Sequence, residues 1–244
     1  MGGAAALLTR PRVLALVALA AGLAAYYYSV DSIPALSTWW DVALLSFGLI
    51  PAVFLLPLLV LPLARARGLL VLAAVLAVVA VLAEVGNLEV LGNFAKLAAV
   101  TFFAFWFLNL FDDLLLLVVV AVVIPWVDAY SVFRGPTGQI VEHHPHVFTR
   151  LSFGFPLPDH QTARLGLPDL LFFSLFLATA QRYRLRPGWT WLGMVAFLDL
   201  TVVIAQWTDL GGLPALPAIS LGFLLPNADL IWAEVTRRRR GGRY

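Results

Sequence analysis

Long apolar runs separated by short charged or proline-containing joints dominate the chain. A run of about 20 apolar residues is long enough to cross a hydrocarbon layer of about 30 Å as a helix. We therefore expect an all-α, polytopic transmembrane bundle with about eight spans, or seven to nine if a boundary shifts. The expected spans are residues 13–30, 42–64, 68–88, 91–111, 113–133, 166–184, 188–210 and 214–233.

The first apolar run allows two interpretations. Arg10 and Arg12 precede it, and it ends in Tyr26, Tyr27 and Tyr28, where an interfacial aromatic belt is expected. This pattern favours a first span. A cleaved signal peptide is the alternative, because charged and apolar regions follow each other in the order that such peptides use.

One long loop divides the chain into two parts. Residues 134–164 are rich in proline and glycine and predict an extracytoplasmic loop in place of a span. The part before it, residues 1–112, holds about four spans, and residues 113–244 hold the rest. Inside the loop, residues 137–142 and 146–153 have a weak pattern for a short hairpin.

Composition and charge agree with a membrane protein. Of 244 residues, 61% are hydrophobic and 12% are charged, whereas soluble domains have about 25% charged residues. With the N-terminus inside, 12 of the 16 basic residues fall on the cytoplasmic side, so the positive-inside rule places both termini there. The arginine tail is interpreted as a topology anchor, and no nucleic-acid partner is expected. The Ala-, Leu- and Arg-rich composition suits a prokaryotic plasma (inner) membrane.

Four acids lie within predicted spans. A carboxylate in hydrocarbon is costly, so each is a functional hypothesis, with a structural hydrogen bond as the alternative. Asp229 lies near the arginine tail and is expected to be structural, whereas Asp199, near the middle of its span, is either a helix contact or a proton-relay acid. Asp128 and Asp169 remain.

Asp128 and Asp169 lie on the two spans that the long loop joins. Each is about four or five residues from the loop end of its span, which is a depth of roughly 6 to 8 Å. The two side chains can therefore face each other. Two close carboxyls in a low dielectric share one proton, so that one acts as a base and the other as an acid, as aspartyl proteolysis requires.

Three short motifs accompany these acids. Asp128 is followed by Ala-Tyr-Ser-Val-Phe, Asp169 closes Gly166-Leu-Pro168-Asp, and Leu213-Pro-Ala-Leu-Pro opens the last span. In this order they resemble the motifs of presenilins and signal peptide peptidases, the GxGD-type intramembrane aspartyl proteases. The resemblance covers residues 113–233, about half of the chain.

The resemblance implies a function and a set of site residues. It implies a presenilin-like fold and an aspartic endopeptidase that cleaves single-span membrane proteins or signal peptides, without a cofactor or metal. The expected orientation resembles that of signal peptide peptidases. Two residues depart from the family pattern: Val127 replaces a tyrosine, and Pro168 replaces the second glycine, so activity has to be assayed. The implied catalytic pair is Asp128 and Asp169, and the residues implied to shape the active site are Gly166, Pro168, Pro214, Ala215 and Leu216.

The buried acids are also compatible with a second class of function. The alternative to a protease is a non-proteolytic membrane protein, either an inactive homologue or an ion-coupled transporter that uses the buried acids. Transporters commonly have internal repeats, which this sequence lacks. Glu142, His143, His144 and His146 superficially resemble a metal cluster, but Pro145 breaks their spacing, so a solvated loop is favoured.

Overall fold

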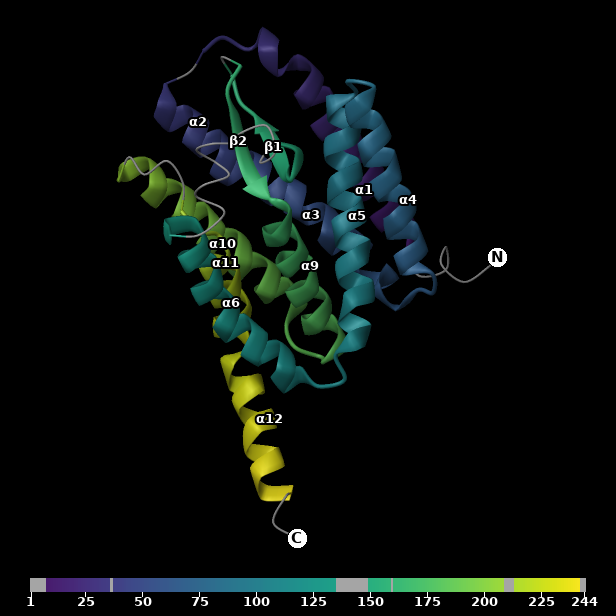
Figure 1. Cartoon of the computed structure of the whole chain (residues 1–244), viewed down its shortest axis with the longest axis vertical. Helices are drawn as coiled ribbons and strands as arrows, with labels where there is room; N and C mark the ends of the chain where they lie inside the picture. Colours follow the sequence, from purple (N-terminus) through teal and green to yellow (C-terminus); the bar gives the residue numbers. More distant parts are fainter. Residues whose placement is uncertain (1–7, 36, 135–148, 159, 209–212, 242–244) are drawn as a thin grey trace.

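The computed structural model describes residues 8–35, 37–134, 149–158, 160–208 and 213–241. Within these ranges the chain is a helical bundle with one two-stranded antiparallel sheet (Figure 1). The principal elements are α1 (Arg10–Ser29), α2 (Thr38–Leu44), the π-helical turn η3 (Leu45–Leu49), α3 (Ile50–Val60), α4 (Leu69–Val85), α5 (Glu89–Phe107), α6 (Leu114–Arg134), β1 (Ser152–Pro156), β2 (Thr162–Gly166), α9 (Leu167–Arg182), α10 (Pro187–Trp207), α11 (Leu216–Leu224) and α12 (Ala228–Gly241). Short 3-10 turns follow several helices: η2 (Val30–Ser32), η4 (Leu61–Arg65), η5 (Leu108–Leu110) and η6 (Leu225–Asn227).

Among the described residues, six helical stretches are long and apolar enough to cross a membrane. They are Arg10–Ser32, Thr38–Arg65, Glu89–Leu110, Leu114–Val132, Pro187–Trp207 and Leu216–Arg238. Two further predicted spans correspond to the shorter helices α4, of 17 residues, and α9, of 16 residues. The protein is thus membrane-embedded, and six of its helices have the length and composition of spans.

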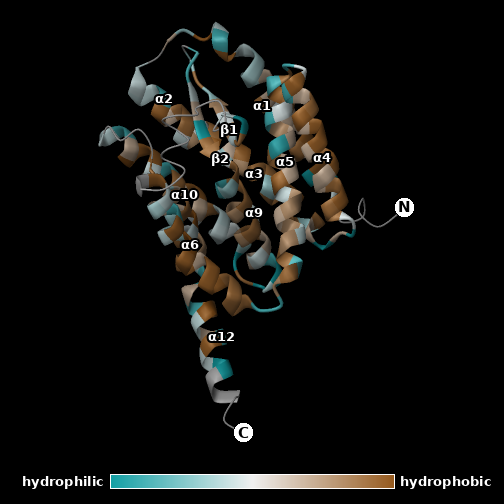
Figure 2. Ribbon diagram, in the orientation of Figure 1, coloured by the Kyte–Doolittle hydropathy of each residue, from teal (hydrophilic) through white to brown (hydrophobic). Residues whose placement is uncertain are grey.

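The outward surface of the bundle is apolar. On α4, the side chains of Val71, Val78 and Leu82 are each more than half exposed, and α6 exposes Trp126 and Val127 in the same way. Figure 2 shows apolar residues along most of the length of α4 and α6. Water would disfavour so much exposed hydrocarbon, whereas lipid chains accept it without cost.

Helix α9 is the centre of the bundle. It packs against α5, α6, α10 and α11 and buries nearly every residue from Leu170 to Ala180, as expected for a helix that is apolar on all sides. Two aromatic contacts fix it: the ring centroids of Phe54 and Phe173 are 4.1 Å apart, and those of Phe176 and Phe223 are 4.8 Å apart.

Helices α10 and α11 approach each other at a glycine pair. A Cβ added to Gly222 would lie 2.3 Å from the backbone nitrogen of Met194, and one added to Gly193 would lie 2.7 Å from the Gly222 carbonyl oxygen. Small residues let membrane helices approach closely where no hydrophobic effect holds them together. Asn227, which is fully buried, adds a polar contact by donating to the Thr190 hydroxyl over 2.7 Å.

A β-hairpin covers one end of this mostly helical bundle. Strands β1 and β2 pair antiparallel with Gly154 opposite Arg164, and Figure 1 shows them above α9, at the end opposite α12. Phe153 and Phe155 alternate along β1 and are buried, so this strand has the period of two that marks a half-buried strand.

The hairpin lies further along the chain than the sequence pattern suggested. The first predicted strand, residues 137–142, lies outside the described residues. Of the second, 146–153, the described residues 149–151 are not strand, and β1 begins at Ser152. The buried phenylalanines at 153 and 155 explain the position, because they place an apolar face on the bundle.

Candidate active site

Asp128 of α6 is half-buried and caps a neighbouring helix. The backbone N–H of Leu216 donates to its Oδ2 atom over 3.0 Å. Leu216 is the first residue of α11, so its N–H is one of the donors that a helix start cannot pair within itself. A carboxylate at this position is also favoured by the helix dipole. The first motif and the third therefore meet through a hydrogen bond between residues 88 positions apart.

Pro214 and Ala215 position this donor. Ala215 is the N-cap residue of α11, and proline also occupies the first turn of the helix at position 217. Proline has no N–H and is tolerated at a helix start, so Pro214 and Pro217 offer no donor to Asp128. The segment Pro214–Leu216 thus presents the Leu216 N–H as its contact with the carboxylate.

Asp169 is in the first turn of α9, nearer to the helix start than its span pattern suggested. Gly166 is the N-cap residue and Asp169 the third residue of the helix, and the Gly166 N–H donates back to the Asp169 carboxyl. This is the contact that an acid three residues after the N-cap makes in a capping box. The Asp169 side chain is therefore held at the point where β2 becomes α9.

Gly166 and Pro168 fit this turn for different reasons. A Cβ on Gly166 would lie 3.1 Å from Asp169 Oδ2, so a side chain there would press on the carboxyl. Pro168 occupies the first turn of α9, where its missing N–H costs nothing. Pro168 is therefore compatible with a helix start.

The two carboxyls interact with each other. Asp128 lies close enough to Asp169 for its charge to act on that carboxyl, and α6 packs directly against α9. The structure thus brings together Asp128, Leu216, Gly166 and Asp169, from three separate segments. Two partly buried carboxyls beside helix starts can hold one proton between them and exchange it with a bound water.

The other two intramembrane acids lie apart from this pair. Asp229 forms a bidentate ion pair with Arg186, with N···O distances of 2.9 and 2.6 Å, which gives it a structural partner. Within the described residues, the buried Oδ1 of Asp199 has no hydrogen-bond partner, and no charge interaction joins Asp199 to Asp128 or Asp169.

Sequence reasoning missed the residues that hold the hairpin. The Tyr26 hydroxyl donates to the Pro156 carbonyl over 2.9 Å, and the Tyr27 hydroxyl donates to the Gly154 carbonyl over 2.8 Å. Asn93, on α5, bonds both main-chain groups of Gly154. The sequence pattern alone assigns Tyr26 and Tyr27 to an interfacial belt. Asn93, a polar residue near the start of the apolar stretch 91–111, is the signal that could have indicated a polar partner.

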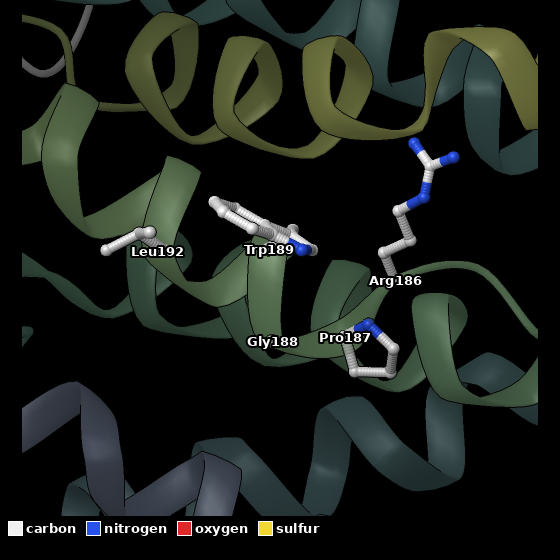
Figure 3. Close-up of a pocket in the computed structure, with 5 residues that line it drawn as sticks. All are labelled: Arg186, Pro187, Gly188, Trp189 and Leu192. Atoms are coloured by element: carbon white, nitrogen blue, oxygen red, sulfur yellow. The ribbon is translucent and has the colours of Figure 1, made fainter.

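A surface pocket of about 530 Å³ lies away from the aspartates and is lined by Arg186, Trp189 and Leu192 at the start of α10 (Figure 3). It is at the far end of α9 from Asp169, and its arginine is already paired with Asp229. Among the described residues no group of three His, Asp or Glu side chains is placed to hold a metal ion. The cluster Glu142 to His146 lies outside the described residues.

Comparison with known proteins adds no relative. No family model matches the chain, and no curated protein matches it significantly.

Proposed function

We propose that the chain is an intramembrane aspartyl protease with Asp128 and Asp169 as its catalytic pair. The observation that carries the proposal is that three motif segments, far apart in the sequence, converge on two interacting carboxyls. A purely structural acid needs one partner. Here each carboxyl has a backbone donor and also a second carboxyl beside it. Placing two carboxyls together costs energy, and a purely structural site would have no reason to bear that cost.

The reaction uses one proton on the pair. The ionised carboxyl takes a proton from water as the water oxygen attacks the scissile carbonyl carbon. The protonated carboxyl gives its proton to the carbonyl oxygen, which forms a diol and exchanges the protonation states of the pair. The first carboxyl then protonates the amine nitrogen while the second takes a proton back from the diol and the C–N bond breaks, so the pair returns to its starting state and one water is consumed.

The hairpin suits a substrate that must be unwound before cleavage. Peptide bonds in a helical substrate are already hydrogen-bonded, so the scissile segment has to become extended. An extended peptide can add to an open sheet edge, and β2 runs directly into the helix that carries Asp169. The outer edge of β1 is already occupied by Tyr27 and Asn93, whereas no described residue bonds the outward main-chain groups of Thr162 and Arg164 on β2.

The proposal includes a topology and a substrate class. It assumes eight spans, a presenilin-like arrangement, and both termini on the cytoplasmic side of a plasma membrane. The aspartates then lie near the outer face, as in signal peptide peptidases. The expected substrates are single-span proteins or signal peptides whose N-terminus faces the cytoplasm.

The test compares three aspartates in one assay. The full chain is reconstituted in proteoliposomes with a single-span substrate, and cleavage products are identified by mass spectrometry. Asp128→Asn and Asp169→Asn keep the side-chain shape but cannot exchange the proton, so both should yield no product. Asp199→Asn, a matched control in which another half-buried acid, on α10, is neutralised, should cleave at the wild-type rate. Equal product from wild type, Asp128→Asn and Asp169→Asn would refute the proposal and identify an inactive homologue.

A further inference from the structure

The outer edge of β1 is closed by side chains from the first part of the chain. The Leu157 N–H donates to the Gln161 carbonyl and the Leu167 N–H donates to the Leu151 carbonyl, so odd-numbered residues of β1 bond β2. The main-chain groups of Gly154 and Pro156 consequently point away from β2. In an isolated hairpin they would be left to water or to another strand.

Asn93 makes with Gly154 the pair of bonds that a neighbouring strand would make. Its Nδ2 atom donates to the Gly154 carbonyl over 2.7 Å, and its Oδ1 atom accepts from the Gly154 N–H over 3.0 Å. The Tyr27 hydroxyl donates to the same carbonyl over 2.8 Å. Both lone pairs of this carbonyl oxygen are thus used, one by α5 and one by α1.

Tyr26 also bonds the outer edge of β1, and aromatic rings pack between the hairpin and helices α1 and α5. The Tyr26 hydroxyl donates to the carbonyl of Pro156, a residue that has no N–H to leave unpaired. The ring centroids of Tyr27 and Phe94 are 5.2 Å apart, and those of Phe94 and Phe153 are 6.0 Å apart. The hairpin is therefore attached to α1 and α5 through its backbone and through its buried face.

This attachment reaches Asp169 through a short, stiff path. β1 is paired with β2 over five residue pairs, from Ser152–Gly166 to Pro156–Thr162. The last residue of β2, Gly166, is also the N-cap of α9 and donates its N–H to Asp169. No flexible linker intervenes between the hairpin and this helix start.

From this path we propose that Tyr27 and Asn93 are positioning residues, which orient the start of α9 so that Asp169 faces Asp128. The assignment of a catalytic purpose rests on the proposed protease function, but the geometric effect does not. α1 and α5 thereby serve the aspartate pair although neither belongs to the segments that carry its motifs. The hydroxyl and the amide, more than the apolar contacts, give the hairpin one orientation, because buried polar groups accept few alternatives.

A crosslinking experiment tests the geometry without any need for catalysis. The chain has no cysteine, so an Asp128→Cys, Asp169→Cys background reports the distance of this pair through its rate of reaction with a short bifunctional thiol reagent. Adding Tyr27→Phe and Asn93→Leu removes three hydrogen bonds to Gly154 and keeps the apolar volume. We expect crosslinking to slow by about tenfold, as a misplacement of about 0.5 Å would produce.

Tyr183→Phe is the matched control. Its hydroxyl donates to the Phe111 carbonyl over 3.2 Å, at the opposite end of α9, so its loss should leave the crosslinking rate unchanged. An unchanged rate in the Tyr27→Phe, Asn93→Leu protein would overturn the proposal, as would equal slowing by Tyr183→Phe. If the double substitution does not fold, Tyr27→Phe alone, which removes a single oxygen atom, replaces it with the same criteria.

A kinetic measurement then separates positioning from general stability. With Asp128 and Asp169 intact, Tyr27→Phe should lower kcat by about three- to tenfold with KM within twofold, after correction for the folded fraction. A fall confined to the thermal midpoint, with kcat unchanged, would overturn the positioning role. Absence of cleavage by the wild type would refute the protease proposal and leave the crosslinking result to decide this one.

Discussion

Gly166 offers a sharp test of how Asp169 is held, because replacing it should perturb the carboxyl without straining the backbone. Its φ and ψ angles are −61° and 146°, a conformation open to any residue. An alanine at position 166 can therefore adopt the same backbone conformation. The cost comes from the new Cβ atom, which would lie 3.1 Å from Asp169 Oδ2.

The size of the effect follows from that distance. Non-bonded atoms rest at roughly 3.5 Å, so the carboxyl must retreat by roughly 0.4 Å. A displacement of about 1 Å from productive geometry costs about 100-fold, which on a logarithmic scale gives about six-fold for this shift. We expect Gly166→Ala to lower kcat by about 5- to 10-fold, while the thermal midpoint changes little.

The assay is cleavage of a single-span substrate in proteoliposomes, with kcat and KM determined separately. Gly188→Ala is the matched control, since it is also a glycine in the first turn of a helix, and none of the described residues places an atom within 4 Å of its added Cβ. It should cleave like the wild type. Gly166→Ala protein with wild-type kcat would refute the reasoning that the carboxyl needs this space.

Three further substitutions test separate parts of the structure. Gly222→Ala should destabilise the bundle by about 3 kcal/mol or more, because its Cβ would lie 2.3 Å from the Met194 nitrogen. Thermal unfolding in detergent measures this change. In the control Gly22→Ala no described atom lies within 4 Å of the added Cβ, so stability should be unchanged or rise by up to about 1 kcal/mol. Pro168→Gly should lower the unfolding free energy by roughly 0.5 to 1 kcal/mol, because glycine gives the unfolded chain more freedom. A variant as stable as the wild type would contradict the conclusion that Pro168 fits the first turn of α9 without strain. The Leu115 backbone N–H, together with Arg238, holds the pKa of Asp113 below its ordinary value of 3.8. The stabilising contribution of the ionised Asp113 carboxylate is therefore complete above about pH 4 and is lost as the pH falls through the lower folded-state pKa. The difference in thermal midpoint between wild type and Asp113→Asn should disappear over that acid range. A difference that persists unchanged to the lowest pH would contradict the assignment.

Some features of this protein could be derived from local pattern. The length of an apolar run depends only on neighbouring residues, so six membrane-length helices were predictable with boundaries a few residues off. The expected single span at 42–64 nevertheless contains a π-helical turn at Leu45–Leu49, which apolar composition does not reveal. Asp229 was predicted to be structural from its charged surroundings, and its partner is Arg186, from the loop between α9 and α10.

Sequence reasoning of the same kind predicted only part of the candidate site. Depth and motif order selected Asp128 and Asp169, because helix rise converts sequence position into distance from the membrane face. The position of Asp169 in the first turn of α9, bonded to the Gly166 N–H, was not predicted. A span pattern cannot distinguish a strand that ends in Gly166 from a helix that begins there.

By itself, then, the sequence determined that this is a membrane-embedded helical protein, which acids enter its apolar segments, and which motifs surround them. These are local properties, and each can be read from a window of about 20 residues. The tertiary structure decided that Asp128 caps α11 by accepting from the Leu216 N–H, that a hairpin stands above α9, and that Tyr27 and Asn93 hold it. Tyr27 and Gly154 are 127 positions apart, and a single hydrogen bond over such a separation leaves no periodic trace in the chain, because its partners meet only after the helices have packed.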